Sequence, residues 1–124
     1  MSIESTLLDP WHPAAFDRLL HGAERASSAE DSWHFLEAAH IVGQMRFVPH
    51  LTVHALMLKR AWHERAIHEV LGQAFRLSLV PLGHLLQRLP RGNTGRSHVS
   101  AFQSMPIRPE LQELIARASA GGLP

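Results

Sequence analysis

The stretch Ser32-Trp-His-Phe-Leu-Glu-Ala-Ala-His-Ile-Val-Gly-Gln44 decides the fold of this chain. Its apolar residues recur every three or four positions, which predicts an amphipathic α-helix. Trp33 and Leu36 mark the side of the helix that faces the core. Glu37 and His40 share that side, because residues three, four and seven positions apart lie on one helical face. The stretch therefore predicts a helix that turns polar side chains inward, where unpaired polar groups cost free energy.

The sequence on both sides of this stretch predicts further helices. Apolar periodicity and turn residues place helical stretches at about Ala14–Ala26, Ser32–Gln44, Pro49–Trp62 and Glu64–Leu79. Pro81 is expected to stop or kink the last of these before a short apolar extension that ends at Leu89. A Gly/Asn/Pro loop over 90–108 and a short helix over 109–118 are expected to follow the helical core, 14–89, of a single all-α domain, 1–124.

Two arrangements of these helices stay open. The short connections predict antiparallel neighbours, that is, helical hairpins. A shift of 34 residues places Trp33–Leu36 over Ile67–Val70, and 34 residues is the spacing of tetratricopeptide repeats. The match covers two units and only part of the repeat consensus. The alternatives are a two-unit tetratricopeptide-like array and a plain four-helix bundle.

Composition excludes several functional classes. The 124 residues are 45% hydrophobic and 19% charged, as in globular proteins. Twelve basic and eleven acidic residues leave a net charge of +1, so no nucleic acid and no anionic membrane is expected as a partner. Neither a signal-peptide pattern nor an apolar run of about 20 residues is present, so we expect a cytoplasmic protein. A protein or small-molecule partner and the oligomeric state are left open.

Ten histidines and no cysteine define the chemistry that the chain can offer. The missing cysteines exclude disulfides, thiolate metal sites and cysteine nucleophiles. Ten histidines in 124 residues are several times the ordinary usage. Because several of them lie at helical spacing, they indicate a chemical role for part of the set.

Polar residues on three consecutive helices are expected to meet in one layer of the domain. If the second and third helices pair about a turn near Phe47, His40 lies opposite His54. If the third and fourth pair about Trp62–His63, Glu69 and Gln73 approach the same level. The predicted site therefore consists of Glu37, His40, His54 and Glu69, with His50 and Gln73 beside them as further ligands or orienting groups.

These residue types favour a divalent transition metal. Glu37-x-x-His40 has the spacing of the carboxylate–imidazole pairs in di-iron and di-manganese bundles. His50-x-x-x-His54 has the spacing at which two imidazoles chelate one ion. Mixed nitrogen and oxygen ligands suit Zn, Fe(II), Mn or Ni. The chain has only one Glu-x-x-His pair, which favours a mononuclear site over a dinuclear one.

The leading functional hypothesis is a metal-binding helical protein, either a metal-dependent enzyme or a metal handler, with no catalytic residue assigned. The alternative is a tetratricopeptide-like protein-interaction module. In that case Glu37–His40 and Glu69–Arg76 hydrogen bonds form a metal-free buried polar network that fixes the helix register. A third hypothesis is a structural subunit that assembles through the apolar segment Leu77–Leu89.

The other histidines are assigned different places. The surface or helix-end group is expected to contain His12, His21, His63 and His84. His34 and His68 are expected to pack beside the buried stripe, and His98 lies in the Gly/Asn loop as a candidate lid ligand or acid/base group. That loop, Arg91–Ser100, is expected to fold back over the helices, with Asn93 and the glycines permitting positive φ.

Several motifs resemble those of a known family. They are Leu36-Glu-Ala-Ala-His-Ile-Val-Gly-Gln44, the pair His50/His54, Glu69-Val-Leu-Gly-Gln73 with Arg76, and Leu89-Pro-Arg-Gly-Asn-Thr-Gly95. Together they resemble a bacterial family of about this length, the domain of unknown function numbered 3703, over roughly Phe16 to Pro109. The resemblance implies the same inward polar residues and the same Gly-Asn-Thr-Gly loop, and it implies no activity.

Overall fold

The computed structural model describes residues 9–86, 93–97, 104 and 106–123. These residues form helices and loops and contain no strand, so the predicted all-α class is confirmed. The helices are α2 (Pro13–Arg25), α3 (Ala29–Gly43), α4 (Phe47–His63), α5 (Ile67–Leu86) and α6 (Pro109–Ser119). Within this part of the chain, each helix is too short or too polar to cross a membrane.

The first two helices begin at side chains that cap free backbone amides. The Nδ1 atom of His12 accepts a hydrogen bond from the Ala15 amide, and Pro13 occupies the first helical position, where its missing N–H leaves no bond unmade. At the start of α3, the Ser28 hydroxyl accepts from the Asp31 amide. These caps explain why α2 and α3 begin where they do, and they give His12 a structural role at the helix end to which the sequence assigned it.

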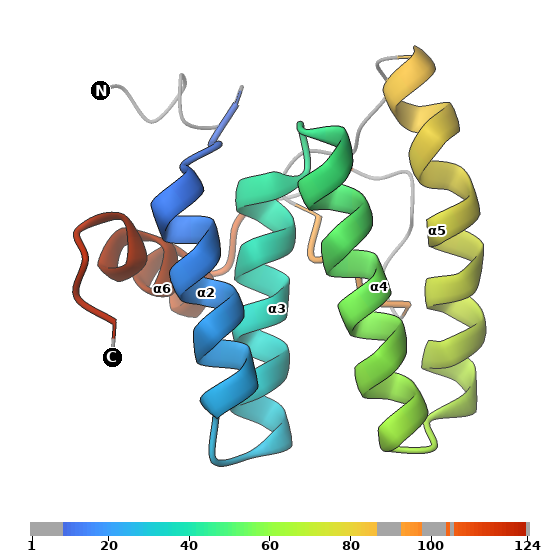
Figure 1. Ribbon diagram of the computed structural model, residues 1–124, viewed down its shortest axis with the longest axis horizontal. Helices are drawn as coiled ribbons and strands as arrows, with labels where there is room; N and C mark the ends of the chain where they lie inside the picture. Colours follow the sequence, from blue (N-terminus) through green and yellow to red (C-terminus); the bar gives the residue numbers. More distant parts are fainter. Residues whose placement is uncertain (1–8, 87–92, 98–103, 105, 124) are drawn as a thin grey trace.

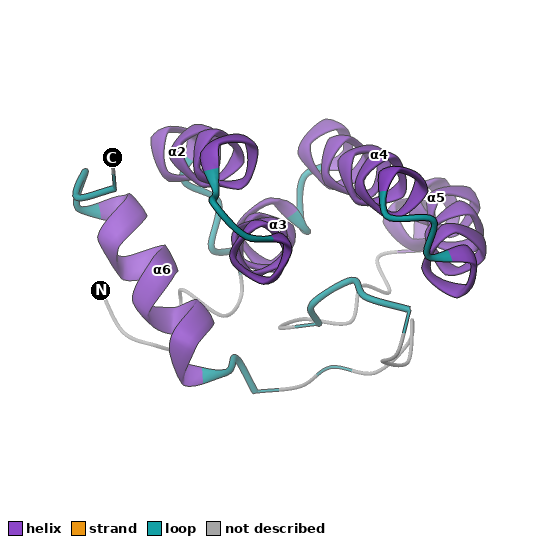
Figure 2. Cartoon of the chain, turned by 90° about the horizontal axis from the view of Figure 1, so that it is seen from below, coloured by secondary structure: helices purple, strands orange, loops and turns teal. Residues whose placement is uncertain are grey.

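The helices form an open row of two antiparallel hairpins, α2–α3 and α4–α5 (Figure 1). Each helix of the row contacts its neighbours in chain order, and α6 packs across α2 and α3 (Figure 2). In the described part of the chain α2 and α5 make no contact, so the row does not close into a four-helix bundle. The tetratricopeptide-like relation between the two hairpins stays a prediction.

The last helix of the row is longer than the sequence predicted. We expected Pro81 to stop or kink this helix; because α5 continues through Pro81 to Leu86, the expected stop is wrong. A proline inside a helix removes one backbone hydrogen bond and costs about 3 kcal/mol. Next to this position, however, Val80 is buried, and one turn further on His84 lies 2.9 Å from His50 of α4. These tertiary contacts act against the cost. The helix therefore carries His84 to the level of His50.

Helix α3 is the centre of the apolar core. It packs against α2, α4 and α6, and its residues from Leu36 to Gly43 are all buried. The core side chains around it include Phe16 and Leu19 of α2, Val53 and Met57 of α4, and Leu111 of α6. Because α3 is enclosed in this way, its inward polar residues have no access to bulk water and must find protein partners.

The buried hydroxyl of Ser32 links α3 to the end of α2, and its contribution to stability can be tested. Ser32 donates its hydroxyl hydrogen to the Ala23 carbonyl at 2.7 Å, satisfying one of the last carbonyls of α2. We expect Ser32→Ala to lower the free energy of unfolding by about 1–2 kcal/mol, because it leaves this carbonyl buried and unpaired. Urea titration followed by circular dichroism measures the change. Thr52→Ala is the matched control, since Thr52 makes an exposed bond of the same length to Val48; equal losses in both variants would contradict the prediction.

Candidate metal centre

Three buried histidines from two neighbouring helices converge on one point. His40 comes from α3, and His50 and His54 come from successive turns of α4. The Nε2 atom of His54 lies 3.1 Å from Nε2 of His40 and 3.2 Å from Nε2 of His50. The three residues are only 2 to 5% exposed, and their ligand atoms all lie within 4.8 Å of one another. This group is close enough to hold a metal ion.

The opposite ring nitrogen of each histidine has a partner outside the cluster. The Nδ1 atom of His40 lies 2.7 Å from the Asn93 carbonyl oxygen. The Nδ1 atom of His54 lies 2.7 Å from Oε1 of Gln73, and Nδ1 of His50 lies 2.9 Å from Nε2 of His84. All three imidazoles therefore turn Nε2 inward and Nδ1 outward, which is how imidazoles orient when Nε2 binds a metal and Nδ1–H is held by a neighbour.

The outer partners fix the protonation of two rings. A carbonyl oxygen only accepts, so Nδ1 of His40 carries the hydrogen that it donates to Asn93. The Gln73 amide nitrogen donates to Glu69 at 2.9 Å and to the Gly95 carbonyl at 2.8 Å, which leaves its oxygen facing His54. His54 must therefore donate from Nδ1. In the neutral rings, the Nε2 atoms of both His40 and His54 carry lone pairs and face each other at 3.1 Å.

Burial keeps these imidazoles neutral. Burial, followed by the neighbouring rings of His54 and His50, lowers the pKa of His40 well below its usual 6.5. Burial is also the main cause that lowers the pKa of His50 to about 3 and that of His54 to about 4. A proton therefore does not bridge the facing lone pairs near neutral pH. A cation placed between them would remove their repulsion.

The spacing of the nitrogens fits such a cation. Two imidazole nitrogens bound to one tetrahedral ion at about 2.0–2.1 Å stand roughly 3.3 Å apart. The two distances at His54, 3.1 and 3.2 Å, are close to this value. The helices thus hold His54 at metal-site spacing from both His40 and His50.

The segment Asn93–Ser97 covers the His40 side of the cluster. Its Asn93 and Gly95 carbonyls accept from His40 and Gln73, respectively. Gly95 has φ +82°, and a Cβ atom at this position would lie 2.7 Å from the His40 ring. Only glycine fits here without strain. The expected folding of the Gly/Asn loop over the helices is confirmed for these residues; the remainder of the loop, with His98, lies outside the described residues.

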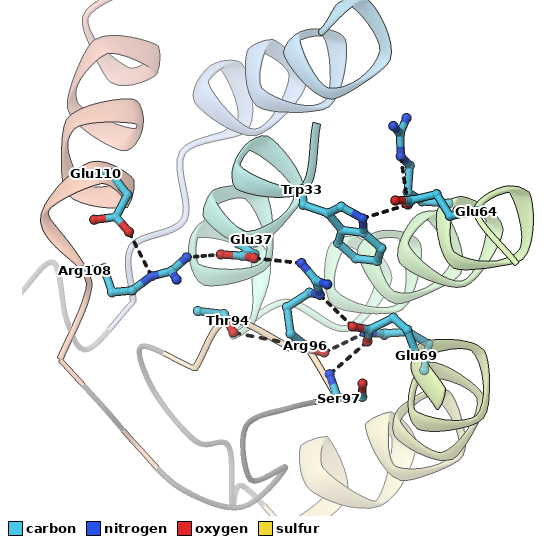
Figure 3. Close-up of polar contacts among 12 residues, drawn as sticks. Trp33, Glu37, Glu64, Glu69, Thr94, Arg96, Ser97, Arg108 and Glu110 are labelled. Carbon is cyan, nitrogen blue, oxygen red and sulfur yellow. Dashed lines mark hydrogen bonds and ion pairs between the residues drawn. The ribbon is translucent and has the colours of Figure 1, made fainter. Parts of the chain in front are cut away.

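Arg96 fastens this segment to α3 and α5 (Figure 3). Its guanidinium lies between two carboxylates, 3.2 Å from Glu37 and 2.7 Å from Glu69, and stacks 3.7 Å from the centre of the Trp33 ring. Arg108 forms a second ion pair with Glu37. Burial would raise the pKa of Glu69, but hydrogen bonds from Arg96, Gln73 and the Ser97 amide outweigh it and lower this pKa below its usual value.

The structure divides the six predicted site residues into two groups. His40, His50 and His54 meet, and Gln73 contacts His54 as an orienting group. The carboxylates of Glu37 and Glu69 instead point to Arg96. His40 bonds Asn93 through Nδ1, so the Glu37–His40 hydrogen bond of the metal-free alternative does not form. The register that brought His40 opposite His54 is confirmed by their contact.

His84 is the residue that sequence reasoning missed. It was assigned to the surface, yet its Nε2 atom lies 2.9 Å from His50 Nδ1. The signal was present in the sequence: Glu69, Gln73, Arg76, Val80 and His84 follow one another at spacings of four and three residues, along one helical face. The expectation that Pro81 stops or kinks the helix hid this continuation.

The buried histidines make metal-free protein sensitive to acid. In the unfolded chain they take up protons near pH 6.5, whereas His54 and His50 in the folded protein resist protonation until about pH 4 and about pH 3. Because the unfolded state binds more protons in this window, the free energy of unfolding should fall as the pH drops from 6.5 toward 4. Urea titrations of chelator-treated protein at each pH measure the slope. His50→Gln/His54→Gln should flatten it, and an equal slope in this variant would contradict the assignment.

Two glycines with the same backbone conformation test the cover over His40. Gly95 and Gly121 have φ of +82° and +81°, but a Cβ atom at Gly121 would meet nothing nearer than 3.7 Å. Gly121→Ala should therefore cost only the backbone strain, about 1–2 kcal/mol. Gly95→Ala should cost more, because it also displaces the His40 ring or the covering segment. Thermal unfolding of both variants decides the comparison; equal losses would show that the Gly95 contact with His40 contributes nothing.

Comparison with known proteins places the chain in a family. A family model described as Protein of unknown function (DUF3703) matches residues 13–115, from the first residue of α2 into α6. No curated protein and no solved structure matches the chain. The match agrees with the resemblance of the polar motifs and contains all six predicted site residues. The chain belongs to the family described as Protein of unknown function (DUF3703).

Proposed function

We propose that this protein binds one divalent transition metal ion through the Nε2 atoms of His40, His50 and His54. The observation that carries the proposal is the pair of lone pairs on His40 and His54, which the bonds at Nδ1 aim at each other across 3.1 Å. Burying two unprotonated acceptors against each other costs free energy unless a cation lies between them. The same arrangement lowers the cost of metal binding, because the ligands need neither deprotonation nor rotation.

The donor set narrows the choice of metal. Three imidazoles suit Zn, Fe, Ni and Cu, whereas Mn prefers carboxylate and water oxygens. Glu37 and Glu69 are engaged with Arg96, so oxygen donors from these two residues would first have to break ion pairs. Of the metals expected from the sequence, this favours Zn, Ni and Fe(II) over Mn.

The residues around the histidines act as supports in this proposal. Gln73 fixes the orientation of His54, and Glu69 fixes Gln73 by accepting from its amide. Such outer partners raise metal affinity about 10–100-fold in other metal sites. When Nε2 of His50 binds the ion, its Nδ1–H would donate to Nε2 of His84, 2.9 Å away. The predicted carboxylates thus contribute to the site through hydrogen bonds rather than as ligands.

Three protein ligands leave one position of a tetrahedral ion for water or another small ligand. Catalytic zinc sites have this composition, and the water bound there becomes acidic enough to react near neutral pH. A metal handler uses the same open position to accept or pass on the ion. Metal binding is common to both roles, and it is the function that we propose.

Calorimetric titration of untagged, chelator-treated protein with Zn²⁺ tests the proposal. We expect one ion per chain and a rise in melting temperature that chelator reverses. Free metal at 100 times the dissociation constant adds about 2.7 kcal/mol of stability, roughly 10 °C for a domain of this size. Co²⁺ should give the intense visible absorption bands of a tetrahedral nitrogen site.

Surface histidines provide the control that a histidine-rich chain needs. His40→Gln and His54→Gln should each abolish the stoichiometric binding and the Co²⁺ bands. His21→Gln and His63→Gln should change neither, because these side chains are exposed and lie outside the cluster. Binding that survives His40→Gln/His54→Gln, or wild-type protein that takes up no stoichiometric metal, would overturn the proposal.

A further inference from the structure

Helix α5 exposes a continuous apolar stripe on the side that faces away from the histidines. Large hydrophobic side chains that are 50 to 80% exposed recur along it at Ile67, Leu71, Phe75, Leu82, Leu85 and Leu86. At about 100° per residue, these six positions fall within roughly 100° of the helix circumference. From Leu71 to Leu85 the positions alternate by four and three residues, with Ser78 in the middle, which is the spacing of a helix–helix seam.

The exposed side of α5 carries no charge. Among its 20 residues, Glu69 and Arg76 are the only Asp, Glu, Lys or Arg, and both are buried on the opposite side. A solvent-exposed helix ordinarily has charged residues on its outer face. Figure 2 shows α5 at the edge of the row, with α4 beside it and no helix among the described residues on its outer side.

We propose that this face of α5 binds a second copy of the same chain, giving a two-fold symmetric dimer held by paired α5 helices. The interface is defined by Leu71, Phe75, Ser78, Leu82 and Leu85, with Ile67 and Leu86 at its rim. The proposal does not depend on the proposed metal function, because the histidine cluster lies on α3 and α4, and the α5 residues that support it are on the face of α5 opposite the seam.

The exposed area fits this partner. At about 200 Å² for a fully exposed large side chain, the six hydrophobic residues present roughly 700 Å², close to the ~800 Å² that each partner buries in a standard stable interface. An apolar patch of this size on a monomer marks an interaction surface. One long helix face is therefore enough for a specific dimer without contributions from elsewhere.

The absence of charge favours self-association. In a two-fold dimer the same face meets itself, so any charge on it would be brought near an identical charge. The α5 face has none, and its straight apolar seam is complementary to a second copy of itself. Different proteins commonly recognise each other through complementary charges, and this face offers no charged group for such recognition.

Sedimentation equilibrium of the full chain in chelator tests the proposal and excludes dimers bridged by metal. We expect a dimer at micromolar concentration. Leu71→Glu and Leu82→Glu should each raise the dimer dissociation constant by roughly 100-fold or more, because every dimer would bury two unpaired carboxylates. Ala14→Glu is the matched control: it adds the same charge to an exposed position of α2 and should leave the dimer intact. Circular dichroism verifies that all variants stay helical.

A single cysteine gives a second readout. The chain has no cysteine of its own, so Ser78→Cys in the middle of the seam should form a covalent dimer on mild oxidation, much faster than Ala14→Cys. Wild-type protein that is monomeric throughout, or a dimer that Leu71→Glu and Leu82→Glu leave unchanged, would overturn the proposal. A monomer destabilised by Leu71→Glu would indicate that the chain covers this face itself, and a monomer that sediments with phosphatidylcholine vesicles would indicate a lipid surface instead.

Discussion

The hydrogen bonds at Nδ1 of His40 and His54 are the constraint on which the arrangement of the site depends. Each bond has an acceptor that cannot donate in return, so each ring presents an unprotonated Nε2 to the other. The enclosed position of α3 removes the water that would otherwise solvate these nitrogens. Burial also holds the pKa values of the cluster low, so that a proton does not relieve the repulsion at neutral pH. A metal ion between the two nitrogens, as we propose, would satisfy both groups.

The covering segment joins two helices that do not pack directly on each other. Helices α3 and α5 are separated by α4 in the row, yet Asn93 and Gly95 bond to His40 and Gln73 from opposite helices. Arg96 adds ion pairs to Glu37 of α3 and Glu69 of α5. Buried charges are stabilised only when they are paired and hydrogen-bonded, and this network meets that condition. The carboxylates therefore secure the cover of the site and the spacing of its helices.

Helix α5 has polar residues on its buried face and apolar residues on its exposed face, the reverse of an ordinary surface helix. Its inner face holds Glu69, Gln73, Arg76 and His84, which serve the site, while its outer face is apolar. Inward polar groups contribute little hydrophobic stabilisation, and the outward leucines, 50 to 80% exposed, contribute less than they would if fully buried. A partner on the outer face would recover this contribution. The buried face of α5 thus supports the proposed metal site on α3 and α4, and its exposed face carries the proposed dimer interface.

Most of the local structure could be predicted from the sequence. The helical periods, the inward stripe of α3 and the pair His50/His54 depend on residues a few positions apart, where helical geometry fixes which side chains share a face. The antiparallel turn between α3 and α4 was short enough to place His40 opposite His54. Pro81 was misjudged because its local cost is outweighed by packing that only the folded chain supplies.

The sequence by itself determined the all-helical class, the positions of the helices and the histidines that meet. Only the tertiary structure decided which polar groups pair with which. Arg96 reaches Glu37 and Glu69 across 59 and 27 residues, and Asn93 reaches His40 across 53. No sequence periodicity spans such separations. The path of the covering segment is set by packing and by the need to pair every buried polar group, so it could not be predicted from the sequence. In the structure, the two glutamates that we expected as ligands instead support a cluster of three histidines.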